Sequence, residues 1–301
     1  MSSQIHLEPE QKPMFGASAR AAAATGPKTI LVHIQDDATI ETRLESALSL
    51  ARAFSAHIAC LHVTPSQAYV AYDGFGGVFI MGEVFKAIEE QEASLRQRIE
   101  AELSNEDVSW DYVQATGETA TQLIGRAALA DLIVSGREPA RSDFVGPAMS
   151  LLGDLVCRSR TPVFIPAEGA PPCDPNGTAL IAWDGSYEAA NAVRSTVGML
   201  AQAAQVHVLQ VEEEKSETFP GTRLLEYLSR HAIHAELTVE SVDDVKFDNL
   251  VPETLVTRAV ALGAAYIVMG GNNHSRLGEY VFGGVTRTML SASPVPILLA
   301  R

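Results

Sequence analysis

The chain has 301 residues, of which 47% are hydrophobic, so it is long and apolar enough to bury the cores of two domains. Its 37 acidic and 22 basic residues leave a net charge of -15, which repels nucleic acid and anionic membranes and excludes both as expected partners. Cys60, Cys157 and Cys173 lie far apart without a CxxC pair, which excludes a disulfide framework and a cysteine-based zinc site.

Residues 1–28 have the composition of an unstructured leader. Ala, Ser, Gly and Pro dominate their later part, and they lack the basic start and apolar centre of a secretory signal. We expect this leader to be disordered. Because no apolar run in the chain approaches the length of a membrane span, the sequence predicts a cytoplasmic protein without a membrane partner.

Strand and helix patterns alternate through residues 29–167 in the order β-α-β-α-β-α-β-α-β. Several of the strands are apolar throughout, and the helices are amphipathic. The expected strands are TILVHI, HIACLHV, WDYVQAT, ADLIVSG and TPVFIP, and the expected helices cover about 39–55, 83–104, 118–130 and 145–159.

A glycine-rich insertion follows the second strand of this half, over residues 65–82. It carries Tyr69, Tyr72, Phe75 and Phe79 among glycines. Two interpretations stay open. The insertion is either a loop that packs its aromatic side chains onto its own domain, or an exposed lid or partner-binding flap.

Residues 178–301 repeat the same order of elements after a Pro- and Gly-rich linker over residues 168–177. The interval from Gly136 to Pro162 equals the interval from Gly270 to Pro296, so the ends of the two halves align without a gap. The expected strands are TALIAW, QVHVLQV, AELTVES, AAYIVMG and VPILLA, and the expected helices cover about 186–203, 220–232, 251–262 and 280–292.

Apolar strands that alternate with amphipathic helices indicate a parallel sheet covered on both faces. Right-handed crossovers then make each half a doubly wound α/β domain. The last strand of each half, PVFIP and PILLA, would be an apolar edge if it were left bare. We therefore expect the two halves to pack against each other there as a pseudo-dimer.

The segments ALIAWDGS (Ala179 to Ser186), AAYIVMG and PVPILL resemble the universal stress protein family in its tandem two-domain form. The resemblance covers about Thr29 to Arg301. It implies five-stranded domains of strand order 3-2-1-4-5, which dimerise when they occur singly. Many members of that family bind ATP through a Gly-x2-Gly-x9-Gly-(Ser/Thr) loop, others lack the loop and do not, and no common reaction is attached to the family.

The stretch GGNNHSRLGEYVFGGVTR holds the corresponding loop of the second half. The resemblance places Gly270 and Gly283 on the first and third glycines, while Asn273 and Gly284 depart from the motif. The position has a physical rationale, because parallel sheets bind ligands beyond the carboxyl ends of their strands and a helix that starts with glycines offers free N–H groups to an anion. Asn tolerates a left-handed turn better than most residues, so the turn is expected to survive.

The remaining site residues predicted for an adenine nucleotide, ATP or AMP, surround this loop. The start of the last helix contributes its main chain and one hydroxyl, the loop contributes donors and a positive charge, and the ends of the first two strands contribute a ribose acceptor and an adenine contact. In that order they are Val285 and Thr286, then His274, Ser275 and Arg276, then Asp184 and Val211. The alternatives stay open: a purely structural loop, Asp184 as a helix cap or turn residue, and Val211 as simply the last residue of its strand.

The corresponding positions of the first half fit a nucleotide poorly. Gly136 is present, but Pro139, Met149 and Ser150 occupy the other motif positions. Proline has no N–H to donate, and methionine places a side chain where bare main chain is needed. Glu138 adds a negative charge. We expect no nucleotide triphosphate there, and a regulatory or structural role for this half.

The sequence lacks the common catalytic signatures. It contains no Gly-x-Ser-x-Gly elbow, no Walker A motif and no strand-linked GxGxxG, and its eight scattered histidines do not suggest a metal site. The expected function is a stress-response binding or signalling module and not an enzyme, with no catalytic residue and unknown protein partners. The alternatives are a weak ATPase or phosphotransfer enzyme, and a ligand-free interaction scaffold. A further homodimer of tandem chains also stays open.

Overall fold

The computed structural model describes residues 26–65, 71–72, 78–79, 82–137, 151–212, 219–241, 250–271 and 282–301. Most of the predicted leader therefore lies outside the described residues, as do Asn273, His274, Ser275 and Arg276 of the predicted site. No helix among the described ranges is long and apolar enough to cross a bilayer.

The first half contains the nine predicted elements in the predicted order. Its strands are β1 (Thr29–Ile34), β2 (His57–Pro65), β5 (Trp110–Gly117), β6 (Leu132–Val134) and β7 (Val163–Ile165). Its helices are α2 (Ile40–Phe54), α3 (Gly82–Leu103), α4 (Thr119–Ala127) and α5 (Leu151–Asp154), and α5 continues as the π-helical turn η2 (Leu155–Ser159).

The second half repeats the pattern. Its strands are β8 (Thr178–Trp183), β9 (Gln205–Glu212), β10 (Ala235–Ser241), β11 (Ala264–Gly270) and β12 (Ile297–Ala300). Its helices are α6 (Tyr187–Leu200), α7 (Gly221–Arg230), α8 (Leu250–Ala261) and α9 (Gly284–Ala292).

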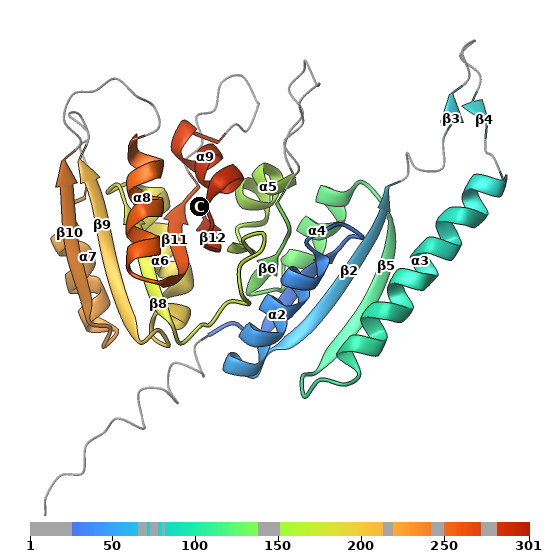
Figure 1. Ribbon diagram of the computed structural model, residues 1–301, viewed down its shortest axis with the longest axis horizontal. Coiled ribbons are helices and arrows are strands. Elements are labelled where there is room, and N and C mark those ends of the chain that lie inside the picture. Colours follow the sequence, from blue (N-terminus) through green and yellow to red (C-terminus); the bar gives the residue numbers. More distant parts are fainter. Residues whose placement is uncertain are drawn as a thin grey trace, which may run out of the picture.

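All ten of these strands form one sheet, in the order β10-β9-β8-β11-β12-β7-β6-β1-β2-β5 (Figure 1). Each half has the expected order 3-2-1-4-5 and parallel pairing throughout. The halves join where β12 pairs antiparallel with β7, with Leu298 opposite Phe164. The apolar edges predicted on the two last strands therefore cover each other.

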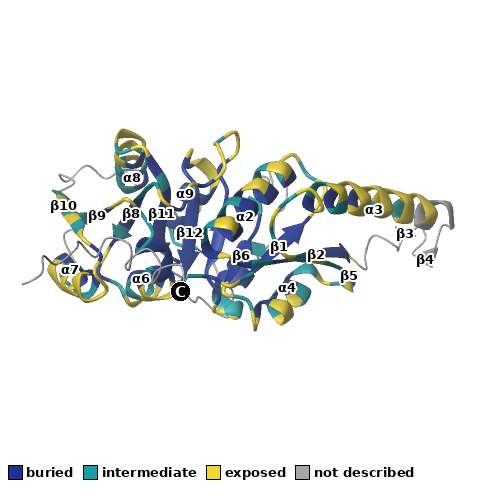
Figure 2. Cartoon of the chain, turned by 90° about the horizontal axis from the view of Figure 1, so that it is seen from below, coloured by how far each residue is buried: buried dark blue, intermediate teal, exposed yellow. Residues whose placement is uncertain are grey.

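Helices cover both faces of this sheet, and each face has one continuous apolar core (Figure 2). The first core packs α2, α3, α6 and α7 against the sheet, and the second packs α4, α5, η2, α8 and α9. Both cores contain residues from both halves, so the pseudo-dimer shares its interior as well as its strand pairing.

Residues at both predicted boundaries contact the body of the protein. Lys28, assigned to the leader by sequence, donates from its main-chain N–H to Asp131 Oδ2 at 2.8 Å and from Nζ to the Phe54 carbonyl at 2.6 Å. Within the linker, Cys173 is buried and its carbonyl accepts from Ser49 Oγ at 2.6 Å. The linker therefore runs against the first half.

The insertion contains a short antiparallel hairpin, β3 (Ala71–Tyr72) with β4 (Val78–Phe79), which neither the packed loop nor the exposed flap of the sequence analysis included. Figure 1 shows it beyond the tip of α3, away from the ten-stranded sheet. Tyr69 and Phe75 lie outside the described residues. The C-terminal part of α3 buries Leu95, Ile99 and Leu103 along one stripe, which fastens this helix to the sheet.

Candidate functional site

The carboxyl ends of β8, β9 and β11 form the edge where the sequence places a nucleotide. Trp183 pairs with Gln210, and Gly270 pairs with Ala300, so Asp184, Val211 and Gly271 follow directly beyond the paired residues. Val211 is half-buried and packs against the core beneath α8 and α9. The helix α9 begins after this edge in the chain and returns along the sheet to β12.

The N-terminus of α9 meets the requirements of an anion site. Gly283 is its N-cap, no side chain of the described residues caps the helix there, and no acidic residue lies in the first turn. The first bond of the helix runs from the Arg287 N–H to the Gly283 carbonyl at 3.0 Å. The amides of Gly284, Val285 and Thr286 therefore have no intrahelical acceptor.

Gly284 leaves room for a ligand to approach these amides. Among the described residues, no atom lies within 4 Å of a Cβ atom built at this glycine. Thr286 points elsewhere: its residue is only 3% exposed. Main-chain groups, and not the Thr286 hydroxyl, are thus the donors that this helix presents.

Asp184 has both a structural and an open oxygen. Its Oδ1 accepts from the Ser186 N–H at 2.9 Å and from Ser186 Oγ at 2.6 Å, and Ser186 Oγ in turn caps α6 by accepting from the Ala189 N–H at 3.1 Å. Gly185 between them has φ of +73°, which favours glycine. The turn and cap interpretation therefore holds for Oδ1, while Oδ2 accepts from none of the described residues.

Gly270 is required by packing alone. A Cβ atom here would lie 2.5 Å from the Ala189 nitrogen and 2.7 Å from the Glu188 carbonyl carbon. The strand β11 can therefore pass the first turn of α6 only as glycine. Because Glu188 gives that turn a negative charge, α9 is the better anion-binding terminus of the two.

An aromatic group that the sequence analysis did not identify borders the same edge. The Trp183 indole donates to the Phe219 carbonyl at 3.0 Å, and the Phe219 N–H donates to the Gly185 carbonyl at 3.1 Å. The Tyr187 ring meets Phe219 edge to face at 5.1 Å and is 72% exposed. A large aromatic residue directly after the Ser186 N-cap was the available signal, and it offers a stacking surface beside the site.

In the first half, an arginine lies beneath Gly136, the glycine that corresponds to Gly270. The Arg43 side chain is fully buried in α2, and its Nη2 lies 2.7 Å from both carboxylate oxygens of Asp37. Its Nη1 donates to the His33 carbonyl at 2.8 Å. A Cβ atom built on Gly136 would lie 3.2 Å from the guanidinium carbon. Arg43 therefore lies directly beneath the first motif glycine of this half.

The second half has a buried alanine instead. A Cβ atom built on Gly136 would meet Thr39, and one built on Gly270 would meet Glu188, so Thr39 and Glu188 hold equivalent places in the two halves. One helical turn later, Arg43 of the first half corresponds to the buried Ala192 of the second. Burial, assisted by the Arg43 charge, lowers the pKa of His33 to about 3, so the imidazole is neutral. The remaining loop positions, Pro139, Met149 and Ser150, lie outside the described residues.

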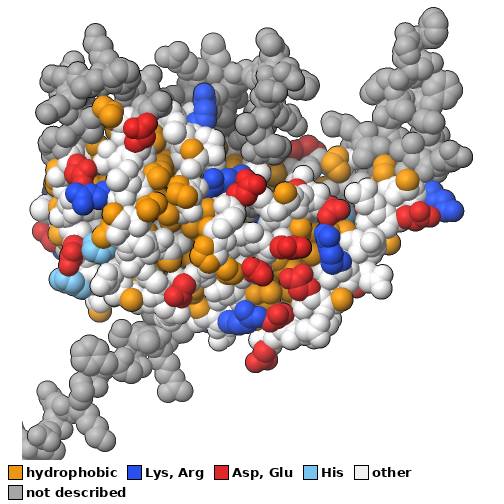
Figure 3. Space-filling model, in the orientation of Figure 1, with side chains coloured by type: hydrophobic (Ala, Val, Ile, Leu, Met, Phe, Trp, Pro, Cys, Tyr) orange, Lys and Arg blue, Asp and Glu red, His pale blue; other side chains and the backbone are white. Residues whose placement is uncertain are grey.

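The field around the first half opposes an anion as well. Figure 3 shows acidic side chains gathered over the α2 and α3 side of the molecule. Glu102, in α3, has a pKa above its usual value because of burial and the charges of Glu41, Glu45 and Glu106. A phosphate approaching this face meets net repulsion.

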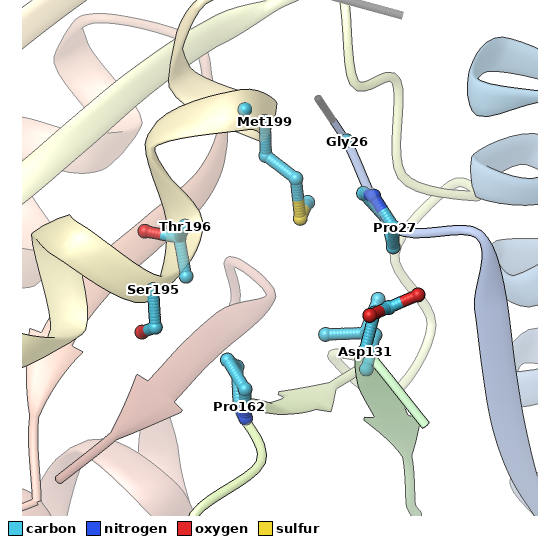
Figure 4. A pocket seen from close by; sticks show the side chains of 9 residues that line it. Gly26, Pro27, Asp131, Pro162, Ser195, Thr196 and Met199 are labelled. Carbon is cyan, nitrogen blue, oxygen red and sulfur yellow. The ribbon is translucent and has the colours of Figure 1, made fainter. Parts of the chain in front are cut away.

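A cavity of about 140 Å³ lies elsewhere, between the halves (Figure 4). Asp131, Pro162 and Pro27 line it from the amino ends of β6, β7 and β1, and Met199 lines it from α6. Its volume falls short of the 300–1,000 Å³ or so of typical ligand pockets. Among the described residues, no group of His, Cys, Asp and Glu is arranged to hold a metal ion.

Comparisons with known proteins agree with this architecture. The model of the universal stress protein family matches residues 176–301. A universal stress protein from Archaeoglobus fulgidus has a TM-score of 0.69 at 14% identity, covering 91% of this chain and 96% of its own. A protein from Pseudomonas aeruginosa described as a universal stress protein has a TM-score of 0.59 at 19% identity, covering 93% and 94%. A search of the curated proteins gave no match.

The two structural matches show the fold over both halves, and the family match covers the half that carries the candidate site. Residues 176–301 therefore match the universal stress protein family, and both halves have the fold of the solved universal stress proteins.

Proposed function

We propose that the second half binds an adenine nucleotide, ATP or AMP, and that the protein acts as a stress-response binding module and not as a catalyst. The observation that carries this proposal is the uncapped N-terminus of α9, which presents main-chain amides beside the open space at Gly284. A phosphate is the ligand that such a terminus favours.

The other described groups suit the rest of a nucleotide. Asp184 Oδ2 is an exposed carboxylate oxygen that accepts a ribose hydroxyl, while Oδ1 keeps its structural bonds. The exposed Tyr187 ring provides a surface for stacking. Arg276, which lies outside the described residues, would supply a positive charge. In this proposal the amides of α9 bind the phosphate, the Asp184 carboxylate binds the sugar, and the Tyr187 ring stacks on the base.

The proposal is tested by nucleotide content and by a substitution that blocks the helix terminus. Protein purified without added ligand is heated, and the released nucleotides are identified by chromatography. ATP affinity is then measured by calorimetry for the wild type, for Gly284→Val and for the control Gly125→Val. A Cβ atom at either glycine would meet no atom of the described residues within 4 Å, so neither change should lower the free energy of unfolding by more than about 0.5 kcal/mol.

We expect Gly284→Val to weaken ATP binding by at least about tenfold, because the added side chain keeps phosphate away from the amides. Gly125→Val, in α4, should bind like the wild type. Equal affinity of both variants would contradict the assignment of the phosphate to α9. Failure of the wild type to take up ATP or AMP would contradict nucleotide binding itself and favour the ligand-free scaffold.

Catalysis is separated from binding by following bound ATP over hours. Unchanged ATP supports the binding module. Steady formation of ADP that disappears in Gly283→Val would instead support a weak ATPase. This variant is chosen because Gly283 is the N-cap at which the phosphate-binding amides begin.

A further inference from the structure

The residue that follows the first motif glycine contacts the other half of the chain. In the second half this residue is Gly271, whose N–H donates to the Ala300 carbonyl at 2.8 Å. A Cβ atom on Gly271 would lie 2.7 Å from Cγ1 of Val156, which belongs to the first half. The point where the predicted nucleotide loop leaves β11 is thus packed directly against the other domain.

Val156 is held there by an irregular helix. It lies in η2, a π-helical turn that continues α5, and it is only 1% exposed. Ser159 Oγ donates to the Leu155 carbonyl at 2.6 Å within the same turn. Isolated π-helical turns are uncommon and often occur at functional positions. Here the turn brings a rigid β-branched side chain against a bare main chain.

The equivalent residue of the first half makes the reciprocal contact. Arg137 follows Gly136, and its Nη2 donates to the carbonyl of Ser293, the C-cap of α9. Ser293 is 1% exposed and its Oγ donates to the Val295 carbonyl at 2.7 Å, so this helix end is fixed. A cation at a helix C-terminus also complements the helix dipole.

We propose that the first half positions the nucleotide site of the second half through these two contacts. Val156 sets where the loop leaves β11, and Arg137 holds the end of α9 opposite its phosphate-binding end. Both are positioning residues and do not touch the ligand. The inference rests on the proposed nucleotide function and adds a role for the half whose own cleft is occupied by Arg43.

The contact at Gly271 permits a steric test. Its φ lies outside the left-handed region, so alanine is tolerated by the backbone and only the contact with Val156 Cγ1 opposes it. Val156→Ala removes that atom. ATP affinity is measured by calorimetry for Gly271→Ala, Val156→Ala and the double variant of the full chain. The control is Gly125→Ala, whose added Cβ atom would meet no atom of another described segment within 4 Å.

We expect Gly271→Ala to weaken ATP binding by about tenfold, because overpacking displaces the base of the loop. The double variant should recover to within about threefold of Val156→Ala alone, since the clash is gone. Arg137→Gln provides a second, milder variant and should weaken binding by about threefold through the loss of charge at the helix end. Additive effects of the two substitutions at the Gly271 contact would overturn the proposal.

A readout without ligand separates this inference from the proposed function. Hydrogen exchange of the amides of residues 287–290, which are the first to bond within α9, is measured on the same variants in the absence of nucleotide. Gly271→Ala should speed exchange at these amides, and Val156→Ala should cancel the effect. If the wild type takes up no ATP, nucleotide binding fails while this cycle still decides the positioning role. Unchanged exchange in Gly271→Ala would overturn it.

Discussion

At the scale of single residues, Arg43 and Asp37 form an ion pair that depends on both partners. The guanidinium is fully buried, and the carboxylate is 29% exposed. Removing either side leaves the other charge without its partner in a place of low dielectric constant. We expect Arg43→Ala, which copies Ala192 of the second half, to lower the free energy of unfolding by about 3 kcal/mol.

The matched variant replaces both charges. The double substitution Arg43→Met with Asp37→Asn should cost less than Arg43→Ala, because it leaves no buried charge and keeps the volume filled. Urea unfolding of Arg43→Ala, Arg43→Met, Asp37→Asn and the double variant gives the comparison, with Arg43→Met and Asp37→Asn as the single variants of the cycle. A double variant that loses the sum of the single losses would show that the pair is not coupled.

Acid gives an independent check on the same pair. Burial raises the pKa of the Asp37 carboxyl, but the Arg43 charge and the hydrogen bonds from Thr39 and Arg43 outweigh it, so the pKa lies below its ordinary value. A depressed pKa contributes stability that is present above the unfolded value of about 3.9 and is lost as the pH falls through the folded value. Asp37→Asn should remove this part of the acid sensitivity below about pH 4.

The burial of Arg43 could have been predicted from its position in the periodic pattern of α2. Periodicity marks Ile40, Leu44 and Ala47 as the apolar stripe of α2, and Arg43 falls on that stripe. A charged side chain on the buried face requires a partner inside the protein. Asp37 and the His33 carbonyl, however, become neighbours of Arg43 only after the strand and helix have packed.

At the scale of elements, hydrophobic periodicity predicted every helix and strand of the ten-stranded sheet that the structure describes. It missed features that depend on tertiary contacts. The π-helical turn η2 was predicted as ordinary helix, because an extra residue per turn does not alter the apolar pattern enough to be recognised. The β3–β4 hairpin was missed because each strand is only two residues long.

The start of α4 illustrates an element that depends on one side chain. Glu118 is its N-cap and accepts from the Ala120 N–H at 3.0 Å and from the Thr121 N–H at 2.7 Å. Glu118→Ala removes both acceptors, so we expect a loss of about 1 kcal/mol in the free energy of unfolding. Thermal and urea unfolding measure it, with Glu118→Asp as the variant that retains a capping carboxylate.

The same cap has a predictable pH dependence. Hydrogen bonds from Thr121 lower the pKa of Glu118, against a smaller effect of burial, so its cap is fully formed above the unfolded pKa of about 4.3. The cap is lost as the pH falls through the depressed folded value. The difference between wild type and Glu118→Ala should therefore shrink below about pH 4, and a constant difference would contradict a charged cap.

At the scale of the whole molecule, the repeat in the sequence predicted the duplicated domain and the strands at which the halves meet. The matching intervals from Gly136 to Pro162 and from Gly270 to Pro296 place the two last strands at equivalent edges. The pairing of the two last strands could be predicted because an apolar strand edge left bare would promote aggregation. The register of β7 on β12 and the contacts of Val156 and Arg137 required the packed structure, because no local pattern encodes distances between residues so far apart in the chain.

The shared sheet and cores predict that the covalent linker is dispensable once the protein has folded. Glu168 and Gly169 are exposed in a turn, and Gly169 has open space around it, so a protease site inserted between Gly169 and Ala170 should be tolerated and cleaved. After cleavage the two fragments should elute together on gel filtration at the volume of the intact chain. The β7–β12 pairing and the apolar clusters that span both halves would hold them together.

Separation of the fragments under native conditions would contradict an interior shared by the two halves. Uncut protein carrying the same insertion controls for the insertion itself, and loss of its folding would call for a second site between Glu168 and Gly169.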